Sequence, residues 1–269
     1  MNPIQEFRAY FSIVAVVIKN RLIGFIVFFS TVFGLISLYL TTFVSLWAML
    51  EKFGSIGSWD RGSVIFIYAL ALMSYGVRVL FSFGMVFFDE DVRRGHFDIT
   101  AIRPMSSLLY QLGLSFQLSG ISHIMAGLFI FLFFQESFSI DMSPLNIVVL
   151  ALAVFSSGLV QVAITIVIAT VSFFLVNTRG LNAFYIGMRE FTFYPVTIFN
   201  KFVIIILFTI LPLAFTTYVP AGIFLDRPEF EILPQPVWMF LSLSAGPFFL
   251  FLASRFWYFG VRFYQGTGN

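Results

Sequence analysis

The chain has 269 residues, of which 59% are hydrophobic and 20% aromatic, while only 10% are charged. Soluble domains carry roughly 25% charged residues, so this composition excludes a water-soluble fold and predicts an all-α polytopic membrane protein. The net charge of +2 does not indicate nucleic-acid binding, and the absence of cysteine excludes disulfides, thiolate metal sites and thiol catalysis.

The first predicted element is a helix within residues 1–20. Its apolar residues at helical spacing are Ile4, Phe7, Phe11, Val14 and Ile18. The pattern predicts an amphipathic helix in the membrane interface, because Arg8, Lys19 and Arg21 would otherwise enter hydrocarbon. The alternative is an extension of the first membrane span. No small-residue cleavage site follows the apolar run, so a cleaved signal peptide is not expected.

Six stretches are apolar over the roughly 20 residues that a helix needs to cross a bilayer. They are about 22–50, 63–86, 108–134, 145–176, 202–218 and 237–256. We therefore expect residues 1–269 to form a single transmembrane domain with six spans.

The connecting segments predict the orientation of these spans. Eleven Lys and Arg lie on one side, in 1–21, 87–107, 177–201 and 255–269, against three on the other side, in 51–62, 135–144 and 219–236. Cytoplasmic loops carry an excess of basic residues. Both termini are therefore expected in the cytoplasm, with the chain in the inner or plasma membrane. The proline-rich 219–236 has two interpretations, an ordered surface loop or a short re-entrant element.

Ionisable residues are scarce inside the predicted spans. Arg78 is near enough to the end of its span to snorkel towards the interface. This leaves His123, with Ser119 nearby, as the one titratable group at mid-membrane depth. These two residues are either a polar site on a substrate or proton pathway or a neutral histidine hydrogen-bonded to a neighbouring helix. The lack of an acidic partner in any span disfavours a proton relay.

Three glycines, Gly113, Gly120 and Gly127, recur every seven residues along the third predicted span. Residues seven apart share one face of a helix, and small residues let helix backbones approach closely in lipid. The spacing predicts a packing face, either within the subunit or at a dimer interface.

Catalytic and nucleotide-binding motifs are missing from the sequence. It contains no GxxxxGK[ST], HExxH or GxSxG pattern and only two histidines. We therefore expect neither an enzyme nor a metal or cofactor bound by this chain.

The densest group of charges is "FFDEDVRRGHFDITAIRPM", residues 87–105, between the second and third spans. Its acidic residues precede its basic ones, which suits a short helix, and Gly95 is expected to end or bend it. Three interpretations compete. The first is a Mg²⁺ site made of Asp89, Glu90, Asp91 and Asp98. The second is a solvated loop, and the third is a docking element for a cytoplasmic partner.

Part of this segment resembles a known family. "VRRGHFDITAIRPMSSLLYQL", residues 92–112, is similar to a stretch of the ABC-2 type transporter permeases, in the group of uncharacterised ABC transport system permease components. The matching residues are Arg94, Gly95, Phe97, Asp98, Arg103, Pro104 and Gln111. Two more segments resemble the family, "FYPVTIFNKFVIIILFTILPLAFTTYVPAGIFL" at 193–225 and the tail "FWYFGVRFYQGTGN" at 256–269. Gly266-Thr267 departs from the small Ser-Ala pairs that are frequent there.

The resemblance implies a type V-like exporter permease with an interfacial N-terminal helix and a cytoplasmic coupling helix within 87–107. The coupling residues would be Asp89, Glu90, Asp91, Arg93, Arg94, Gly95, Phe97, Asp98, Arg103 and Pro104. It implies assembly with a dimer of ATP-binding subunits, which would bind ATP and Mg²⁺. It also implies pairing with a second permease, and a related chain is favoured over an identical copy.

The function expected from these features is a permease subunit of an ATP-driven exporter. It would form half of the pathway, in contact with membrane lipid, for an amphipathic or hydrophobic drug, lipid or peptide. The alternative is a membrane structural or assembly protein whose charged loop docks a partner that is not an ATPase.

Overall fold

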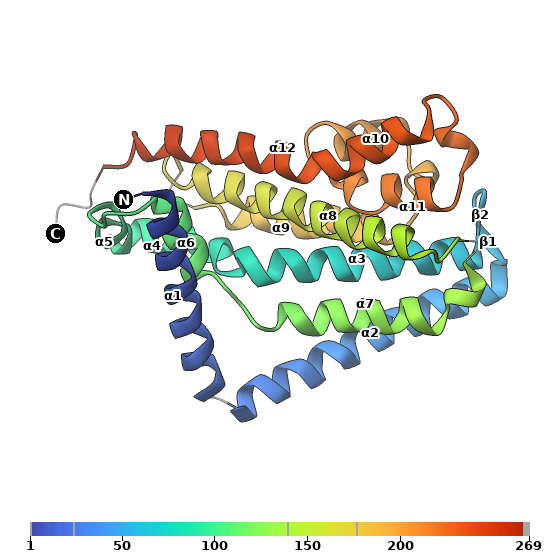
Figure 1. The fold of residues 1–269 in the computed structure, drawn as a ribbon, viewed down its shortest axis with the longest axis horizontal. Coiled ribbons are helices and arrows are strands. Elements are labelled where there is room, and N and C mark those ends of the chain that lie inside the picture. Colours follow the sequence, from blue (N-terminus) through green and yellow to red (C-terminus); the bar gives the residue numbers. More distant parts are fainter. Residues whose placement is uncertain (1, 24, 139, 176, 266–269) are drawn as a thin grey trace.

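The computed structural model describes residues 2–23, 25–138, 140–175 and 177–265. The α-helices are α1 (Pro3–Ile23), α2 (Phe25–Phe53), α3 (Arg61–Ser82), α4 (Phe88–Arg93), α5 (His96–Ala101), α6 (Ser107–Leu114), α7 (Gly120–Phe133), α8 (Pro144–Val171), α9 (Arg179–Arg189), α10 (Lys201–Phe208), α11 (Tyr218–Phe224) and α12 (Gln235–Val261). Helices α3, α7, α8 and α12 lie side by side along one axis, α2 slants away from them, and α1 crosses one end of this bundle (Figure 1).

Short elements join these helices. Two-residue strands β1 (Ser55–Ile56) and β2 (Trp59–Asp60) pair antiparallel between α2 and α3. The 3-10 helices are η1 (Phe83–Phe87), η2 (Gln135–Ser137), η3 (Glu190–Phe193), η4 (Val196–Ile198), η5 (Leu213–Thr216) and η6 (Pro228–Phe230). Below, the α5 end is the end of the bundle with α4, α5 and α6, and the α11 end is the end with β1, β2 and α11 (Figure 1).

The centre of the bundle is α3, which is buried along nearly its whole length between α7 and α8, while α12 packs on the other side of α8. Local sequence explains where these helices begin. The Asp60 side chain accepts a hydrogen bond from Gly62 N (3.1 Å) at the start of α3. Ser143 caps α8, and Pro144 occupies its first turn, where no intrahelical N–H is needed.

Four helices in the described part of the chain are long and apolar enough to cross a membrane, over Phe29–Phe53, Arg61–Arg93, Pro144–Val171 and Gln235–Val261. They correspond to the first, second, fourth and sixth predicted spans. The structure therefore does not confirm six spans, because the third and the fifth predicted spans are not single long helices. The predicted N-terminal helix is present as α1, which is separate from α2 and packs on α6.

The third predicted span, 108–134, is broken into α6 and α7. Between them, the backbone of residues 115–119 bonds to α3 and η1 instead of continuing a helix. Gln117 N donates to Leu80 O (3.1 Å), and Gly84 N donates to Ser115 O (3.3 Å). These tertiary hydrogen bonds compensate for the helical ones that are lost, which a hydropathy pattern does not reveal.

The fifth predicted span, 202–218, folds back on itself. After α10, the Phe215 carbonyl in η5 accepts a hydrogen bond from Ser157 Oγ (3.2 Å), halfway along α8. The chain then returns to the α11 end, where the Tyr218 ring lies 5.6 Å from Trp59. Of the two interpretations of 219–236, the structure supports the folded-back element at its start, because α11 is buried.

The crossing that replaces this span is made by α9, η3 and η4, in a segment predicted to be a cytoplasmic loop (177–201). It starts at the α5 end and passes the middle of α8, where Tyr185 OH donates to Gln161 Oε1 (3.1 Å). It reaches the α11 end at Ile198, 3.5 Å from a Cβ built on Gly57. Arg189 and Lys201 were counted for the cytoplasmic side, but they do not lie at the α5 end. The excess of basic residues at the α5 end is therefore smaller than predicted but is not reversed.

Candidate functional site

The charged segment 87–105 folds into a helical hairpin at the α5 end. Helix α4 has Asp89, Glu90 and Asp91 in its first turn and Arg93 in its last, the order that complements a helix dipole. Gly95 separates α4 from α5 with φ 71°, a left-handed conformation that glycine adopts without a Cβ penalty. The predicted single helix is therefore two short ones, with the bend at the predicted glycine.

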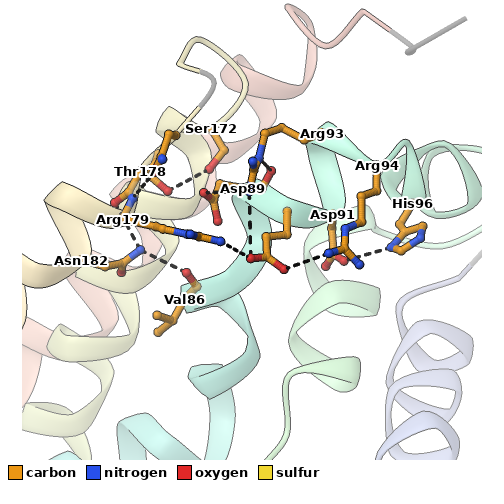
Figure 2. Close-up of polar contacts among 12 residues, drawn as sticks. Val86, Asp89, Asp91, Arg93, Arg94, His96, Ser172, Thr178, Arg179 and Asn182 are labelled. Atoms are coloured by element: carbon orange, nitrogen blue, oxygen red, sulfur yellow. Dashed lines mark hydrogen bonds and ion pairs between the residues drawn. The ribbon is translucent and has the colours of Figure 1, made fainter.

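Glu90 connects this hairpin to another part of the chain. Its carboxylate lies 4.0 Å from Arg93 Nη2 and 3.7 Å from Arg94 Nη2. It also accepts a hydrogen bond from Arg179 Nη2, at the start of α9 (Figure 2). A movement of α4 would therefore act directly on α9, the helix that begins the unpredicted crossing.

A second set of contacts at the same place involves buried groups. Asp89 has a side chain only 1% exposed, with its Oδ2 3.8 Å from Arg93 Nη2 and without a hydrogen bond. Asn182 Nδ2 in α9 donates to the Val86 carbonyl (3.1 Å), at the end of η1 (Figure 2). The Asn182 bond holds the residues before α4 against α9, whereas the Asp89 contact lies within α4.

The other acidic residues of the hairpin have different partners. Asp91 lies 3.4 Å from His96 Nδ1 and accepts from Gln111 Nε2 (3.1 Å) in α6. Asp98 accepts from Tyr264 OH (2.7 Å), beyond the end of α12. Burial of the Tyr264 hydroxyl and its bond to Asp98 raise the pKa of Tyr264 to about 12, so it stays protonated at neutral pH.

An aromatic cluster fixes the hairpin to the ends of the long helices. Phe88 and Phe97 are 0% and 1% exposed. The Phe88 ring lies 4.9 Å from Trp257 in α12, and the Phe97 ring lies 5.1 Å from Phe173 and 4.9 Å from Tyr264. Phe97 was predicted as part of a docking surface, but its side chain faces the protein's own core.

Exposed apolar residues of the hairpin follow Phe97. Ile102 is 84% exposed and Ile99 53% exposed. Arg103 is also exposed, with its guanidinium 5.2 Å from the Tyr110 ring, and Pro104 follows it. Of the predicted coupling residues, Arg93, Arg94, Arg103 and Pro104 are exposed and Gly95 is half-buried, whereas Asp89 and Phe97 are buried.

The Mg²⁺ interpretation needs acidic side chains that converge. In the part of the chain that the structure describes, no three His, Asp or Glu side chains lie close enough to hold a metal ion. Asp89, Glu90, Asp91 and Asp98 are instead directed to Arg93, Arg179, Gln111 and Tyr264, as described above.

We predict that Gly95→Ala loosens the hairpin. An L-residue in the left-handed region costs roughly 1–2 kcal/mol. Amide hydrogen exchange in 88–101 should therefore accelerate about 5- to 30-fold, provided exchange proceeds by local opening. The control is Gly180→Ala in α9, where a new Cβ would meet nothing within 4 Å. Equal exchange rates in the two variants would contradict the prediction.

The three predicted packing glycines do not form one stripe, because Gly113 lies in α6 and the other two in α7. A Cβ built on Gly113 would lie 3.1 Å from Ile13 of α1. Cβ atoms on Gly120 and Gly127 would lie 2.6 Å from Gly76 O and 2.7 Å from Ala69 O, both in the backbone of α3. All three contacts are within the subunit.

A buried polar network crosses the middle of the bundle. Arg78 does not snorkel to the interface. It is 2% exposed, and its Nε donates to Thr165 Oγ1 (3.1 Å) in α8. Gln161 donates to Ser74 Oγ (3.1 Å) and accepts from Tyr185 OH (3.1 Å). The network therefore joins α3, α8 and α9 through side chains.

His123 lies beside this network. Its Nδ1 is 2.8 Å from the carbonyl of Ser119, one turn earlier in the chain. The interpretation of a histidine bonded to a neighbouring helix is therefore not supported for this nitrogen. Its ring lies 5.2 Å from Tyr39 and 5.1 Å from Tyr75. The guanidinium of Arg189 lies 4.0 Å from the same Tyr75 ring. His123 is therefore not the only ionisable group at this depth.

Arg189 was missed as a residue of the bundle interior because 177–201 was assigned to a loop. One signal pointed the other way. Between Leu181 and Phe199 the chain has only two charged residues, Arg189 and Glu190, which is unusual for a water-exposed connection.

Comparison with known proteins identifies the family. The model of the ABC-2 family transporter protein matches residues 36–268. No curated protein and no solved structure matches the chain. The family match includes the α4–α5 hairpin, the mid-bundle network, the last three long helices and α2 from residue 36. The chain therefore belongs to the ABC-2 transporter family and is a multi-pass membrane component of a transporter.

Proposed function

We propose that this chain is the permease subunit of an ATP-driven exporter and that the α4–α5 hairpin receives the movement of its ATP-binding partner. The observation that carries this proposal is the combination of an exposed tip, Ile99 and Ile102, with a base buried against α9 and α12. A partner that engages the tip would move both helices, because Glu90 pairs with Arg179 of α9 and the buried Phe88 ring packs on Trp257 of α12.

The energy source is proposed to lie on a separate chain. The sequence has no nucleotide-binding motif, so a dimer of ATP-binding subunits would hold ATP and Mg²⁺. A second permease, related to this one, would complete the pathway, with both termini in the cytoplasm. The apolar and aromatic interior favours an amphipathic or hydrophobic substrate.

The test uses the chain co-expressed with a candidate ABC ATP-binding subunit. Ile102→Asp should reduce stimulation of ATP hydrolysis about 10-fold or more, because a charge replaces a central apolar contact. The matched control is Ile232→Asp at the α11 end, because Ile232 is 83% exposed and Ile102 is 84% exposed. ATPase activity and co-purification are measured for both variants.

Two results would count against the proposal. Stimulation that survives Ile102→Asp would exclude the hairpin as the receiving surface. A wild-type chain that co-purifies with no ATPase and stimulates none would instead favour the assembly-protein alternative.

A further inference from the structure

Two arginines share one aromatic ring in the middle of the bundle. Arg78 extends from α3 and Arg189 from the last residue of α9. Their guanidinium carbons lie 5.5 Å and 4.0 Å from the centre of the Tyr75 ring. Tyr75 is 14 residues into the 22-residue α3, so both cations lie far from either end of the bundle. Cations at this depth are costly in a membrane protein and usually serve binding or transport.

The negative charge near this pair is insufficient. Glu190 Oε1 accepts from Arg189 Nη2 (2.5 Å), but its carboxylate is half exposed and is the only acidic partner that the described residues provide for either arginine. The Nε and Nη1 atoms of Arg189 are buried and have no hydrogen-bond partner in this part of the structure. The Arg189 side chain itself is only 11% exposed.

The rings around the arginines do not remove this deficit. Tyr75 and Phe193 contact the Arg189 guanidinium through their faces, at 4.0 and 5.5 Å. A cation–π contact stabilises the charge but accepts no hydrogen bond in the guanidinium plane. A buried donor without an acceptor costs free energy, and so does a buried cation without an anion. One bound anion would satisfy both requirements.

We propose that Arg78 and Arg189 form a binding site for the phosphate head group of an amphipathic molecule. Guanidinium groups bind phosphate through paired N–H donors, and Arg78 adds a second positive charge beside Tyr75. The chain next to Arg189 provides an apolar surface. Neither arginine lines a cavity of about 410 Å³ that begins at Phe191 and Tyr194 and extends towards the α11 end, where Met49 and Ile56 form part of its wall. The site therefore suits a ligand with an anionic head and an apolar body.

This inference rests on the proposed transport function, because it names the chemical class of the substrate. It also explains why Arg78 is held so firmly. Its bond to Thr165, which itself donates to Gln161 O (2.9 Å), fixes the guanidinium beside Tyr75 before any ligand arrives. A preorganised cation binds an anion without the cost of ordering a flexible side chain.

The test measures binding to the purified full chain in a neutral detergent, without the ATPase. The probe is radiolabelled dodecyl phosphate, and competitors are inorganic phosphate and dodecyltrimethylammonium bromide. We expect saturable binding, and an apparent Kd raised about 10-fold or more by Arg189→Gln, because charge-assisted hydrogen bonds are lost. Arg189→Lys keeps the charge but not the planar donors, so its apparent Kd should lie between those of wild type and Arg189→Gln.

The matched control is Arg255→Gln, because Arg255 is an exposed arginine of α12. Thermal unfolding of each variant, followed by tryptophan fluorescence, shows whether it is folded. Arg78→Gln should weaken binding in the same direction as Arg189→Gln. If Arg78→Gln does not fold, Arg189→Gln and Arg189→Lys still decide the question, because Arg189 lies at a helix end and makes fewer buried bonds.

The competitors identify the source of the phosphate. If inorganic phosphate displaces the radiolabelled probe at concentrations similar to those of unlabelled dodecyl phosphate, the site binds anions. That result would overturn the proposal that its ligand is amphipathic. Displacement by dodecyl phosphate alone would support both. Equal affinity of wild type and Arg189→Gln, or equal displacement by dodecyltrimethylammonium, would overturn the site. Because no ATPase is present, this failure is distinct from a failure of Ile102→Asp to uncouple hydrolysis.

Discussion

Replacing Gly120 with valine is expected to prevent α7 from packing on α3. A Cβ at this position would lie 2.6 Å from both Gly76 O and Leu80 N. Both atoms belong to the α3 backbone, which cannot turn aside as a side chain does. Overpacking of this kind costs about 3 kcal/mol, at the upper end of the usual range. Little correctly folded chain should therefore be recovered.

The measurement is the thermal midpoint of the purified chain, with its yield as a monodisperse peak. Gly34→Val in α2 is the control, because a Cβ on Gly34 would meet nothing within 4 Å. The thermal midpoint of Gly120→Ala should lie between those of wild type and Gly120→Val, since one methyl group requires a smaller separation of the helices. Equal midpoints for Gly120→Val and Gly34→Val would show that α3 and α7 are not as close as described.

Replacing Trp257 with alanine is expected to release the α4–α5 hairpin from α12. The Trp257 ring is fully buried and lies 4.9 Å from Phe88 and 5.3 Å from Phe173. Its Nε1 donates to Ser107 Oγ (3.1 Å) in α6. Loss of a buried tryptophan typically costs about 3–5 kcal/mol, and here the cavity would open where the hairpin, α6 and α12 meet.

The effect should appear in two measurements. The thermal midpoint of the chain should fall, and hydrogen exchange in 88–101 should accelerate more than exchange in α3. Phe259→Ala is the control two residues further along α12, because Phe259 is half exposed. Trp257→Phe should recover much of the stability but lose the bond to Ser107. A variant with reduced midpoint but unchanged exchange in the hairpin would show that Trp257 does not anchor α4 and α5.

The charged segment shows how far local sequence leads. Its acid-to-base order and Gly95 were enough to predict a helical element with a bend, because the helix dipole and the left-handed conformation are local effects. The inward position of Phe97 was not predictable from this pattern. Phe97, Ile99 and Ile102 are all apolar, and only the presence of Phe173 and Trp257 decides which of them is buried.

Hydropathy failed where the chain exchanges helical hydrogen bonds for tertiary ones. The run 108–134 is apolar enough to cross, yet Gln117 bonds to Leu80 and divides it. The run 202–218 is apolar enough as well, yet Phe215 bonds to Ser157 and the chain turns back. The crossing falls instead to the less hydrophobic α9, whose Tyr185 finds an acceptor in Gln161.

The sequence by itself determined that this is a multi-pass helical membrane protein and that one charged segment stands apart, because composition and local backbone preferences act without long-range contacts. Only the tertiary structure decided which apolar runs cross the bundle and that Arg78 and Arg189 meet at Tyr75. These features depend on hydrogen bonds and ring contacts between residues far apart in the chain. Arg78 is buried at a place where Thr165 of another helix accepts its hydrogen bond, and that pairing is a property of the folded protein.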